Sequence, residues 1–189
     1  MPVKPQILKV TSVARSRLFH VEALELRFSN GVERSYERLA TRGRGAVMIV
    51  PILANGDVVL IREYAAGLDE YPLTLPKGLI DPGENAEQAA HRELQEEAGF
   101  GSRKLERLKE MTSAPNYMGH RMTVLLARDL YPSQLEGDEP EPLDPVHWPL
   151  SELEALVQRE DFSEGRAIAA LYMARTRLEL EAGSVSATD

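Results

Sequence analysis

The sequence predicts an α/β fold, an α/β/α sandwich around a mixed β-sheet, with an antiparallel β-ribbon at its N-terminus. Three observations predict it: strand-like apolar runs around two Asn-Gly pairs, one helix pattern between strands, and further helix patterns near the C-terminus. A chain of 189 residues is long enough to bury one core and short for two. We therefore expect one folded domain with an N-terminal extension.

The strand-like segments are residues 18–28, 32–39, 46–53, 57–64, 104–111 and 122–130. The first two flank Asn30-Gly31 and the next two flank Asn55-Gly56, a dipeptide that favours the two-residue turn of a β-hairpin. The first pair therefore predicts the N-terminal ribbon. The second pair is apolar enough to form buried central strands, so we expect it in the core sheet.

One helix pattern lies between the strands, over residues 86–98. Asn85 can cap its first turn, and Gln88 occupies the third helical position, as a capping box requires. Gly99 can end the helix in the left-handed conformation. The helix should therefore have well-defined ends.

Two further helices are expected near the C-terminus. The segment from Ser151 to Glu154 resembles a capping box that opens the first, and Ser163 can open a second that extends to about Glu181. The small and polar residues that follow predict disorder. The expected divisions are residues 1–44 for the ribbon, 45–181 for the main domain and 182–189 for a disordered tail.

Two segments should be irregular because prolines and glycines crowd them. Residues 72–83 contain three prolines and two glycines, which predicts a loop that leads into the helix. Residues 136–145 are acidic and rich in proline, and proline excludes a continuous helix or strand there. Both loops are candidates for a binding site.

Composition narrows the classes of function. A formal net charge of −8 repels a nucleic-acid backbone, so DNA and RNA are not expected partners. The lack of cysteine excludes disulfides, thiol catalysis and cysteine-bound zinc. The sequence shows neither a secretory signal nor an apolar run long enough to span a bilayer. We therefore expect a cytoplasmic protein without a membrane partner.

Three carboxylates, Glu93, Glu96 and Glu97, share one side of the predicted helix. A solvated acidic face is the ordinary explanation of such a cluster. At about 100° per residue, however, Glu93 and Glu97 fall within the arc of the apolar residues, where carboxylates are costly unless paired or bound to metal. Oxygen ligands favour Mg²⁺ or Mn²⁺, which also bind phosphate oxygens. The helix thus indicates phosphoryl-type chemistry.

These residues belong to a longer pattern. Five residues separate Gly78 from Glu84, and seven separate Glu84 from the run Arg92-Glu93-Leu94-Gln95-Glu96-Glu97-Ala98-Gly99-Phe100. This pattern resembles a complete Nudix box, and a chance match has a probability on the order of one in ten million. The resemblance implies a Nudix-type sandwich and metal-dependent hydrolysis.

The resemblance also implies a role for each position of the box. The implied metal ligands are Glu93, Glu97, Glu96 and the backbone carbonyl of Gly78. Arg92 would orient the glutamates, and Glu84 would fix the preceding loop against the helix. Mg²⁺ is the implied cofactor, and Mn²⁺ can substitute for it.

Features outside the box resemble the ADP-ribose pyrophosphatase subgroup. Pro115 lies fifteen residues after Phe100, as in that subgroup, and Tyr117 lies near where diadenosine polyphosphate hydrolases carry a tyrosine. Strings such as K-G-L-I-D-P-G-E and L-Y-P-S-Q-L-E-G-D-E-P-E-P-L resemble bacterial hydrolases of ADP compounds over nearly the whole chain. The resemblance implies a homodimer that cleaves the pyrophosphate bond of ADP-ribose, NADH or diadenosine di- and triphosphate and releases AMP.

Several residues outside the box are candidates for substrate contacts. Arg62 and Glu63 end a predicted strand and can bind the pyrophosphate or ribose, or form a strand-end ion pair. Tyr117, near Pro115, can stack on adenine or lie at an amphipathic rim. Arg44, together with Arg42, is either part of a lid over the substrate or a solvated loop residue.

The chain departs from the subgroup just before the box. Many ADP-ribose pyrophosphatases read Glu-Leu-Pro-Ala-Gly there, whereas this chain reads Thr74-Leu75-Pro76-Lys77-Gly78. A substrate contact through the missing glutamate is therefore not expected. Lys77 instead adds a positive charge near the expected phosphates.

A further group should take the proton from the attacking water, because a metal-bound carboxylate is a poor proton acceptor. The acidic segment 136–141 is the candidate, placed where the ADP-ribose subgroup carries its catalytic acidic loop. Within it we expect Glu141 first and Glu139 second, since both lie nearest the following strand. Glu96 is the alternative base, and an ordinary solvated loop is the alternative explanation.

Two other functions stay open. A non-catalytic sensor with the same fold would bind ADP-ribose without cleaving it, although a charge cluster this costly argues against a pure binding module. A Nudix hydrolase for nucleoside triphosphates would share the box, but Pro115 argues against it.

Overall fold

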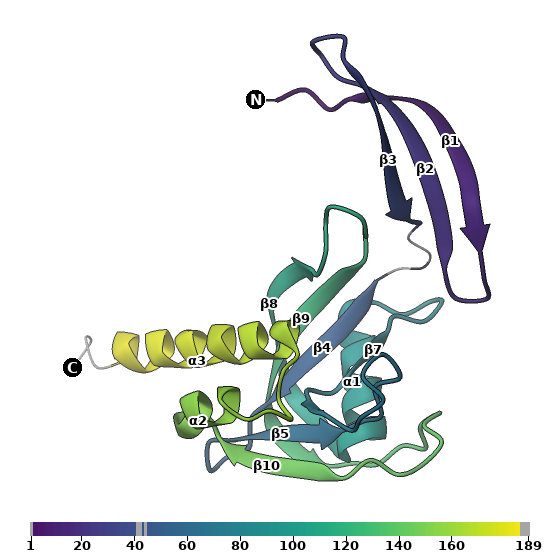
Figure 1. Cartoon of the computed structure of the whole chain (residues 1–189). Coiled ribbons are helices and arrows are strands. Elements are labelled where there is room, and N and C mark those ends of the chain that lie inside the picture. The colour runs from purple at the N-terminus through teal and green to yellow at the C-terminus, as the bar shows by residue number, and fades with distance from the viewer. Residues whose placement is uncertain (1, 41–42, 44, 186–189) are drawn as a thin grey trace. The chain divides into compact units, whose positions relative to one another are not determined.

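The structure is a computed structural model that describes residues 2–40, 43 and 45–185. It contains two compact units, Met1–Gly43 with Thr112–Arg121, and Arg44–Met111 with Met122–Asp189. The first unit contains the N-terminal sheet, and the second contains the helices of the described chain (Figure 1).

The first unit is built on a three-stranded antiparallel sheet. Its strands are β1 (Gln6–Arg15), β2 (His20–Arg27) and β3 (Glu33–Leu39), with β2 in the middle. The predicted hairpin between β2 and β3 is confirmed, and Gly31 adopts a φ of 82° in its turn. The turn is longer than a two-residue one, because the N–H of Phe28 donates to the carbonyl of Val32.

The sequence does not predict β1. Two register shifts against β2, between Ile7 and Lys9 and between Ser12 and Ala14, interrupt the alternation of apolar and polar side chains. Since a period of two residues is the main sign of a half-buried strand, these irregularities hide β1 from a sequence pattern.

The second unit contains two sheets. Its strands are β4 (Ala46–Pro51), β5 (Asp57–Arg62), β6 (Leu73–Thr74), β7 (Lys77–Leu79), β8 (Phe100–Thr112), β9 (Arg121–Pro132) and β10 (Pro145–Pro149). One sheet has the order β7-β4-β9-β8 and is mixed, as predicted, because β4 is parallel to β9 and antiparallel to β7. The other has the order β10-β5-β6 and is antiparallel.

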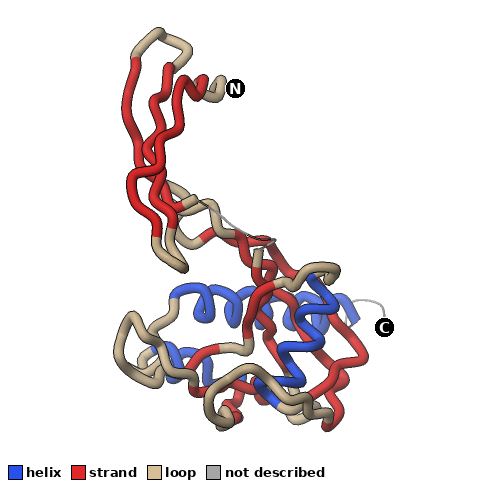
Figure 2. Tube along the Cα trace, turned by 90° about the vertical axis from the view of Figure 1, so that its right-hand side faces the viewer, coloured by secondary structure: helices blue, strands red, loops and turns tan. Residues whose placement is uncertain are grey.

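Helices cover both faces of these strands (Figure 2, helices in blue). The helical segments are α1 (Ala86–Ala98), the 3₁₀ turn η1 (Leu150–Glu152), α2 (Leu153–Val157) and α3 (Gly165–Val185). Along β4, Met48 and Val50 join a core cluster with residues of α2 and α3, whereas Val47 and Ile49 join a cluster with α1. The predicted α/β/α sandwich is therefore confirmed. None of the helices in the described ranges combines the length and the apolarity needed to cross a membrane.

The two apolar segments around Asn55-Gly56 do not form one ladder. β4 and β5 belong to different sheets, and Ile52 and Val58 form an isolated bridge between their ends. Each is a central strand, with β4 between β7 and β9, and β5 between β10 and β6. A continuous apolar run predicts such burial but not the choice of partner.

The C-terminal helices differ from the prediction at their ends. Ser151 lies inside η1, α2 begins at Leu153, and the residue that precedes α2 makes no side-chain cap, so the predicted capping box is wrong. Burial of Leu150, Leu153 and Leu156 in the core decides the local conformation instead. α3 continues to Val185, so the helix includes part of the predicted disordered tail; residues 186–189 lie outside the described residues.

Candidate active site

Helix α1 carries the glutamates that the sequence singles out, and its ends are as predicted. Asn85 and Gln88 form a reciprocal capping box, and Gly99 ends the helix with a φ of 73°. The apolar side of the helix buries Ala89, Ala90, Leu94 and Ala98. Glu93 and Glu97 lie among them and are only 8% and 6% exposed. A solvated acidic face is therefore the wrong explanation for these two glutamates.

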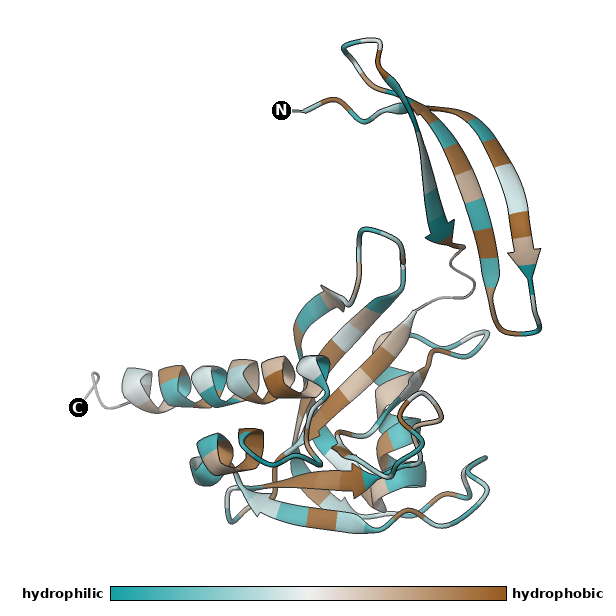
Figure 3. Cartoon of the chain, in the orientation of Figure 1, coloured by the Kyte–Doolittle hydropathy of each residue, from teal (hydrophilic) through white to brown (hydrophobic). Residues whose placement is uncertain are grey.

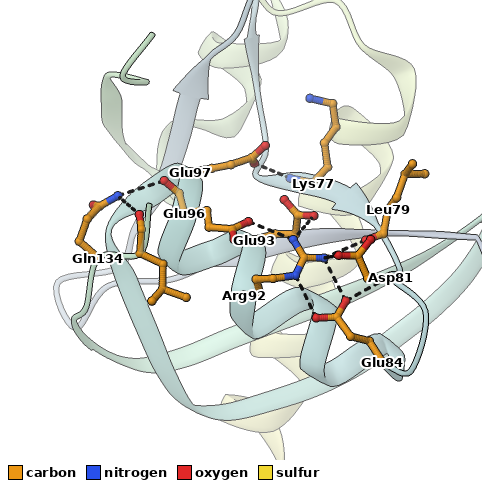
Figure 4. Close-up of polar contacts among 10 residues, drawn as sticks. Lys77, Leu79, Asp81, Glu84, Arg92, Glu93, Glu96, Glu97 and Gln134 are labelled. Carbon is orange, nitrogen blue, oxygen red and sulfur yellow. Dashed lines mark hydrogen bonds and ion pairs between the residues drawn. The ribbon is translucent and has the colours of Figure 1, made fainter. Parts of the chain in front are cut away.

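Arg92, in the middle of α1, donates hydrogen bonds to three carboxylates (Figure 4). Its guanidinium donates two hydrogen bonds to Glu84, at 2.9 and 3.0 Å, one to Glu93 at 2.8 Å and one to Glu96 at 3.0 Å. It also donates to the carbonyl of Leu79 at 3.0 Å. The bonds from Arg92 lower the pKa of Glu84. Arg92 thus holds the preceding loop and two helix carboxylates together.

Strand β7 brings the backbone close to the buried glutamates. The backbone N–H of Lys77 donates to Glu97 at 2.8 Å, and the Lys77 ammonium forms an ion pair with Glu63. Gly78 lies against Glu93, because a Cβ at this position would stand 1.9 Å from a carboxylate oxygen of Glu93. Any side chain at residue 78 would displace that carboxylate, so this close approach requires glycine.

Burial changes the acidity of both buried glutamates. It raises the pKa of Glu97 to about 8, although the backbone N–H and the charge of Lys77 oppose the change. Burial also raises the pKa of Glu93, against the effect of Arg92. Both carboxylates are therefore costly to ionise here, and a bound cation would offset that cost.

These side chains line one wall of a cavity of about 650 Å³, and residues 136–139 of the acidic loop, residues 136–142, line another. The carboxylates that line it are Glu63, Asp81, Glu93, Glu96, Glu97, Glu136, Asp138 and Glu139. The lining contains these eight carboxylates but two cationic side chains, Lys77 and Arg92. A cavity with this balance repels an anionic substrate unless a cation binds as well.

The acidic loop separates this cavity from a second one of about 420 Å³. Glu139 lines both cavities, whereas Glu141 lines the second. Burial raises the pKa of Glu139, and the nearby charge of Glu63 adds to the effect. Glu141 shares the second cavity with Glu96 and Glu97, but of the two glutamates that the sequence proposes as base, Glu139 is the one that also lines the first cavity with Glu93.

Two side chains hold the ends of the acidic loop. At its start, the Gln134 amide donates to the carbonyl of Glu96 at 3.1 Å and to that of Leu135 at 3.0 Å (Figure 4). Near its end, the Tyr71 hydroxyl donates to the Glu141 carboxylate at 2.5 Å. No pattern in the sequence predicts a role for Tyr71, because the pairing of a loop tyrosine with a glutamate far along the chain has no local signal.

Arg62 does not line the cavity. Its guanidinium donates to the carbonyl of Tyr71 at 3.1 Å and to Asp161 at 2.7 Å. This is the strand-end ion pair that the sequence offers as the alternative, although the partner is Asp161, which the sequence does not indicate. A contact between Arg62 and the substrate stays a prediction. Glu63, its neighbour, does line the cavity.

The remaining predicted substrate contacts lie elsewhere in the chain. Pro115 and Tyr117 belong to the first unit, where the N–H of Leu39 donates to the carbonyl of Tyr117 at 2.8 Å. The Tyr117 side chain is exposed, as a ring free to stack on a base would be. Arg42 and Arg44 lie outside the described residues.

The carboxylates are engaged by the protein itself in this structure. Glu93 and Glu96 accept hydrogen bonds from Arg92, and Glu97 accepts one from Lys77. Among the residues that the structure describes, no three acidic or histidine side chains converge closely enough to hold a metal ion as they stand. The donors are nevertheless hard oxygen atoms on one side of one helix, which is the chemistry that Mg²⁺ and Mn²⁺ prefer.

Comparison with known proteins matches almost the whole chain. Residues 5–38 match the NudE-type Nudix hydrolase N-terminal domain, and residues 42–171 match the NUDIX domain. The chain is 53% identical to the ADP compounds hydrolase NudE of Escherichia coli strain K12, over 93% of this chain and 94% of that protein. It is 23% identical to the ADP-ribose pyrophosphatase of Bacillus subtilis strain 168, over 93% of this chain and 97% of that protein.

A solved structure agrees in fold as well as in sequence. This chain superposes on the crystal structure of an ADP compounds hydrolase with a TM-score of 0.90 and 51% sequence identity. The match covers 96% of this chain and 97% of the chain in the crystal structure. Its likeness extends over both the ribbon and the main domain. The chain therefore belongs to the Nudix hydrolase family.

Proposed function

We propose that this chain hydrolyses the pyrophosphate bond of ADP-linked compounds, such as ADP-ribose, NADH and diadenosine di- or triphosphate, and releases AMP. One observation carries the proposal: Glu93 and Glu97 lie buried in an acidic cavity, within a chain 53% identical to an ADP compounds hydrolase. Nudix hydrolases in general need a divalent metal ion. Such an ion is also what this cavity requires before it can accept a diphosphate.

The proposed metal ion is Mg²⁺, with Mn²⁺ as a substitute. The proposed ligands are the carboxylates of Glu93, Glu97 and Glu96 and the carbonyl of Gly78. Burial raises the pKa of Glu97 and of Glu93, so a cation beside them would stabilise their charged forms. When bound, the ion supplies positive charge that neutralises the diphosphate and makes water more acidic.

The protein side chains orient the substrate and the ligands. Arg92 fixes Glu93 and Glu96 by hydrogen bonds at 2.8 and 3.0 Å. The Lys77 ammonium, now paired with Glu63, is free to donate to a phosphate oxygen when substrate displaces that carboxylate. The proposed contacts to the rest of the substrate are Glu63, Arg44, Pro115 and Tyr117.

Glu139 is the proposed general base. It lines the cavity with Glu93 and Glu97, and burial raises its pKa, which makes it a better proton acceptor than an exposed carboxylate. The water oxygen forms a bond to phosphorus, the bond from phosphorus to the bridging oxygen breaks, and the water proton passes to Glu139. Glu141 is less suited to this step, because it accepts a hydrogen bond from Tyr71 and lines the second cavity.

A homodimer is proposed through the N-terminal sheet. On one face of this sheet, Ile7 and Val10 of β1 pair with Leu26 and Leu24 of β2. Tyr36 of β3 pairs with Leu24 from the other side. Ile7, Val10 and Tyr36 are exposed, and Figure 3 shows the apolar bands along β1 and β2. An apolar face of this kind is typical of a surface that a second copy covers.

Light scattering after size-exclusion chromatography tests the dimer. Val10→Glu should convert a dimer to a monomer, because it places a charge in the apolar face. Thr11→Glu is the matched control, since Thr11 pairs with Ala23 on the opposite face, beside the Lys9–Glu25 ion pair. A wild-type protein with the mass of a monomer would exclude the dimer.

A product assay tests the activity itself. ADP-ribose, NADH, diadenosine diphosphate, a sugar nucleotide and the dNTPs should each be incubated with wild-type protein and Mg²⁺, and AMP should be quantified. We expect AMP from the ADP-linked compounds at kcat/KM values above those for dNTPs. A clear preference for dNTPs would assign the other kind of Nudix hydrolase, and tight binding of ADP-ribose without cleavage would assign a sensor.

A further inference from the structure

We propose that Tyr71 is a positioning residue, whose hydrogen bond to Glu141 holds the acidic loop so that Glu139 faces the metal-binding side of the cavity. The inference rests on the proposed function, because it assigns the base to Glu139. It gives the two loop glutamates different tasks: Glu141 anchors the loop, and Glu139 accepts the proton.

Tyr71 lies in a hairpin whose backbone is fixed by other residues of the second unit. Between Glu63 and Pro72, the N–H of Ala65 donates to the carbonyl of Glu70 at 2.9 Å. The carbonyl of Tyr71 accepts a hydrogen bond from Arg62, which Asp161 fixes through an ion pair at 2.7 Å. The backbone of Tyr71 is thus tied to strand β5 and, through Asp161, to the segment before α3.

The ring of Tyr71 is oriented as well as its backbone. It packs against the ring of Tyr64, with 5.3 Å between centroids. The Tyr64 hydroxyl donates to Asp69 at 2.7 Å and not to Glu141, so Tyr71 is in contact with the ring of Tyr64 while the Tyr64 hydroxyl is engaged elsewhere. Tyr71 is half exposed, yet its hydroxyl points to the Glu141 carboxylate at 2.5 Å. A phenol that donates to a carboxylate forms one of the stronger hydrogen bonds in proteins.

Because of the covalent geometry of the loop, fixing Glu141 also limits the conformation of Glu139. Pro140 lies between Glu139 and Glu141, and its ring fixes φ near −65°. A residue that precedes proline is restricted to extended conformations, so Glu139 also has few choices. With Glu141 held, the backbone between the two glutamates has little freedom, and the Glu139 side chain keeps its direction.

The start of the loop is held independently. The N–H of Leu135 donates to the carbonyl of Gln95 at 3.3 Å, and the Gln134 amide donates to that of Glu96. The loop therefore spans two anchors, one on α1 and one on Tyr71, with a cavity on each side of it. Loss of the Tyr71 anchor would leave the loop free to swing toward the second cavity, and Glu139 would move with it.

The kinetic test compares two tyrosines on the same hairpin. Tyr71→Phe should lower kcat by roughly tenfold, because it removes one hydrogen bond to a charged group, with little change in KM. Tyr64→Phe is the matched control, since it removes the same atom from a ring whose hydroxyl does not reach the loop. Glu141→Leu should reproduce Tyr71→Phe, and Glu141→Gln should lose less, because the amide oxygen still accepts the bond.

A double-mutant cycle shows whether Tyr71 acts through Glu139. In a Glu139→Gln background, Tyr71→Phe should have no further effect on kcat. An equal loss in both backgrounds would overturn the inference, as would wild-type kcat in Tyr71→Phe. A loss of more than roughly 10²-fold in Glu141→Gln would also overturn it, because that loss would identify Glu141 as the base.

A measurement without metal or substrate separates this inference from the proposed function. Within residues 136–142, a glutamate-specific protease can cleave after Glu136 but not after Glu139 or Glu141, which precede proline. Cleavage after Glu136, followed by mass spectrometry, should be faster in Tyr71→Phe than in wild-type and Tyr64→Phe proteins. Equal rates would overturn the inference even if the enzyme is active. Wild-type protein that releases no AMP would instead refute the proposed function.

Discussion

The two walls of the active-site cavity are built in opposite ways. The wall on helix α1 depends on contacts between residues close in sequence, such as the capping box of Asn85 and the bonds from Arg92 to Glu84. The acidic loop has no regular structure and is held by distant partners, Gln134 on Glu96 and Tyr71 on Glu141. The wall proposed to bind metal is therefore built mainly by local contacts, whereas the wall proposed to supply the base depends on a few side chains from distant parts of the chain.

The largest effect is expected on the helix wall. Glu97→Gln should lower kcat by roughly 10³-fold or more, since it weakens the metal site that supplies several kcal/mol to the reaction. Without metal, the free energy of unfolding of Glu97→Gln should be at least as large as that of the wild type, because a buried neutral amide replaces a buried acid. Steady-state kinetics and urea unfolding measure the two effects.

Glu87→Gln is the matched control for this prediction. Glu87 lies in the first turn of the same helix and is exposed, so the change should leave kcat as it is. A folded Glu97→Gln protein with wild-type turnover would contradict the metal-binding role of the helix wall.

On the loop wall, Glu139→Gln should lower kcat by roughly 10²–10⁴, the range expected when a general base is lost. The affinity for Mn²⁺, measured by titration calorimetry, should stay unchanged because Glu139 is not a proposed ligand. If Glu139→Gln keeps full activity and Glu141→Gln loses it, the two loop residues exchange roles. If both keep full activity, Glu96 becomes the leading base.

A smaller effect, on metal affinity, is expected where Gly78 of β7 lies against Glu93 of α1. Gly78→Ala brings a Cβ to within 1.9 Å of Glu93 unless that carboxylate moves, so metal affinity should fall by roughly tenfold or more. The fold should persist, because the displaced group is the end of a side chain. Gly67→Ala is the control, since a Cβ there meets no atom within 4 Å. Equal metal affinities of the two variants would show that the close approach is unimportant.

The smallest effect concerns the support under the loop wall. Hydrogen bonds from Arg159 and Arg62 hold the pKa of Asp161 well below its ordinary value. The stability this provides is present above the unfolded-state pKa near 4 and is lost as pH falls toward the lower folded-state pKa. Asp161→Asn should therefore reduce the free energy of unfolding at pH 7, by on the order of 1 kcal/mol. Urea titrations should show this difference shrinking below about pH 4, and a constant difference would contradict the ion pair.

The sequence predicts the helix wall well because its determinants are local. The Asn85 cap, the Gly99 stop and the positions of Glu93 and Glu97 all follow from a period of 3.6 residues and from capping rules. The same logic predicts burial of β4 and β5. It does not show that they belong to different sheets, because β4 pairs with β9 and β5 with β10, two strands far along the chain.

The loop wall is largely beyond a sequence pattern. The acidic segment predicts a loop near the site, but not which glutamate reaches the cavity or that Tyr71 binds the other one. Arg62 shows the same limit, since a pairing with Asp161 across the fold has no local signal. Local rules therefore predict how an element is made and not which distant side chain fixes it.

One measurement tests the central claim most directly. Wild-type protein should be incubated with ADP-ribose and Mg²⁺ in ¹⁸O-labelled water, with and without excess chelator, and the products should be analysed by mass spectrometry. We expect AMP and ribose 5-phosphate, with one labelled oxygen in the phosphate of one of them, and loss of both products when the chelator removes the metal. Intact ADP-ribose in the presence of Mg²⁺, or unchanged turnover with chelator, would contradict metal-dependent hydrolysis in this cavity.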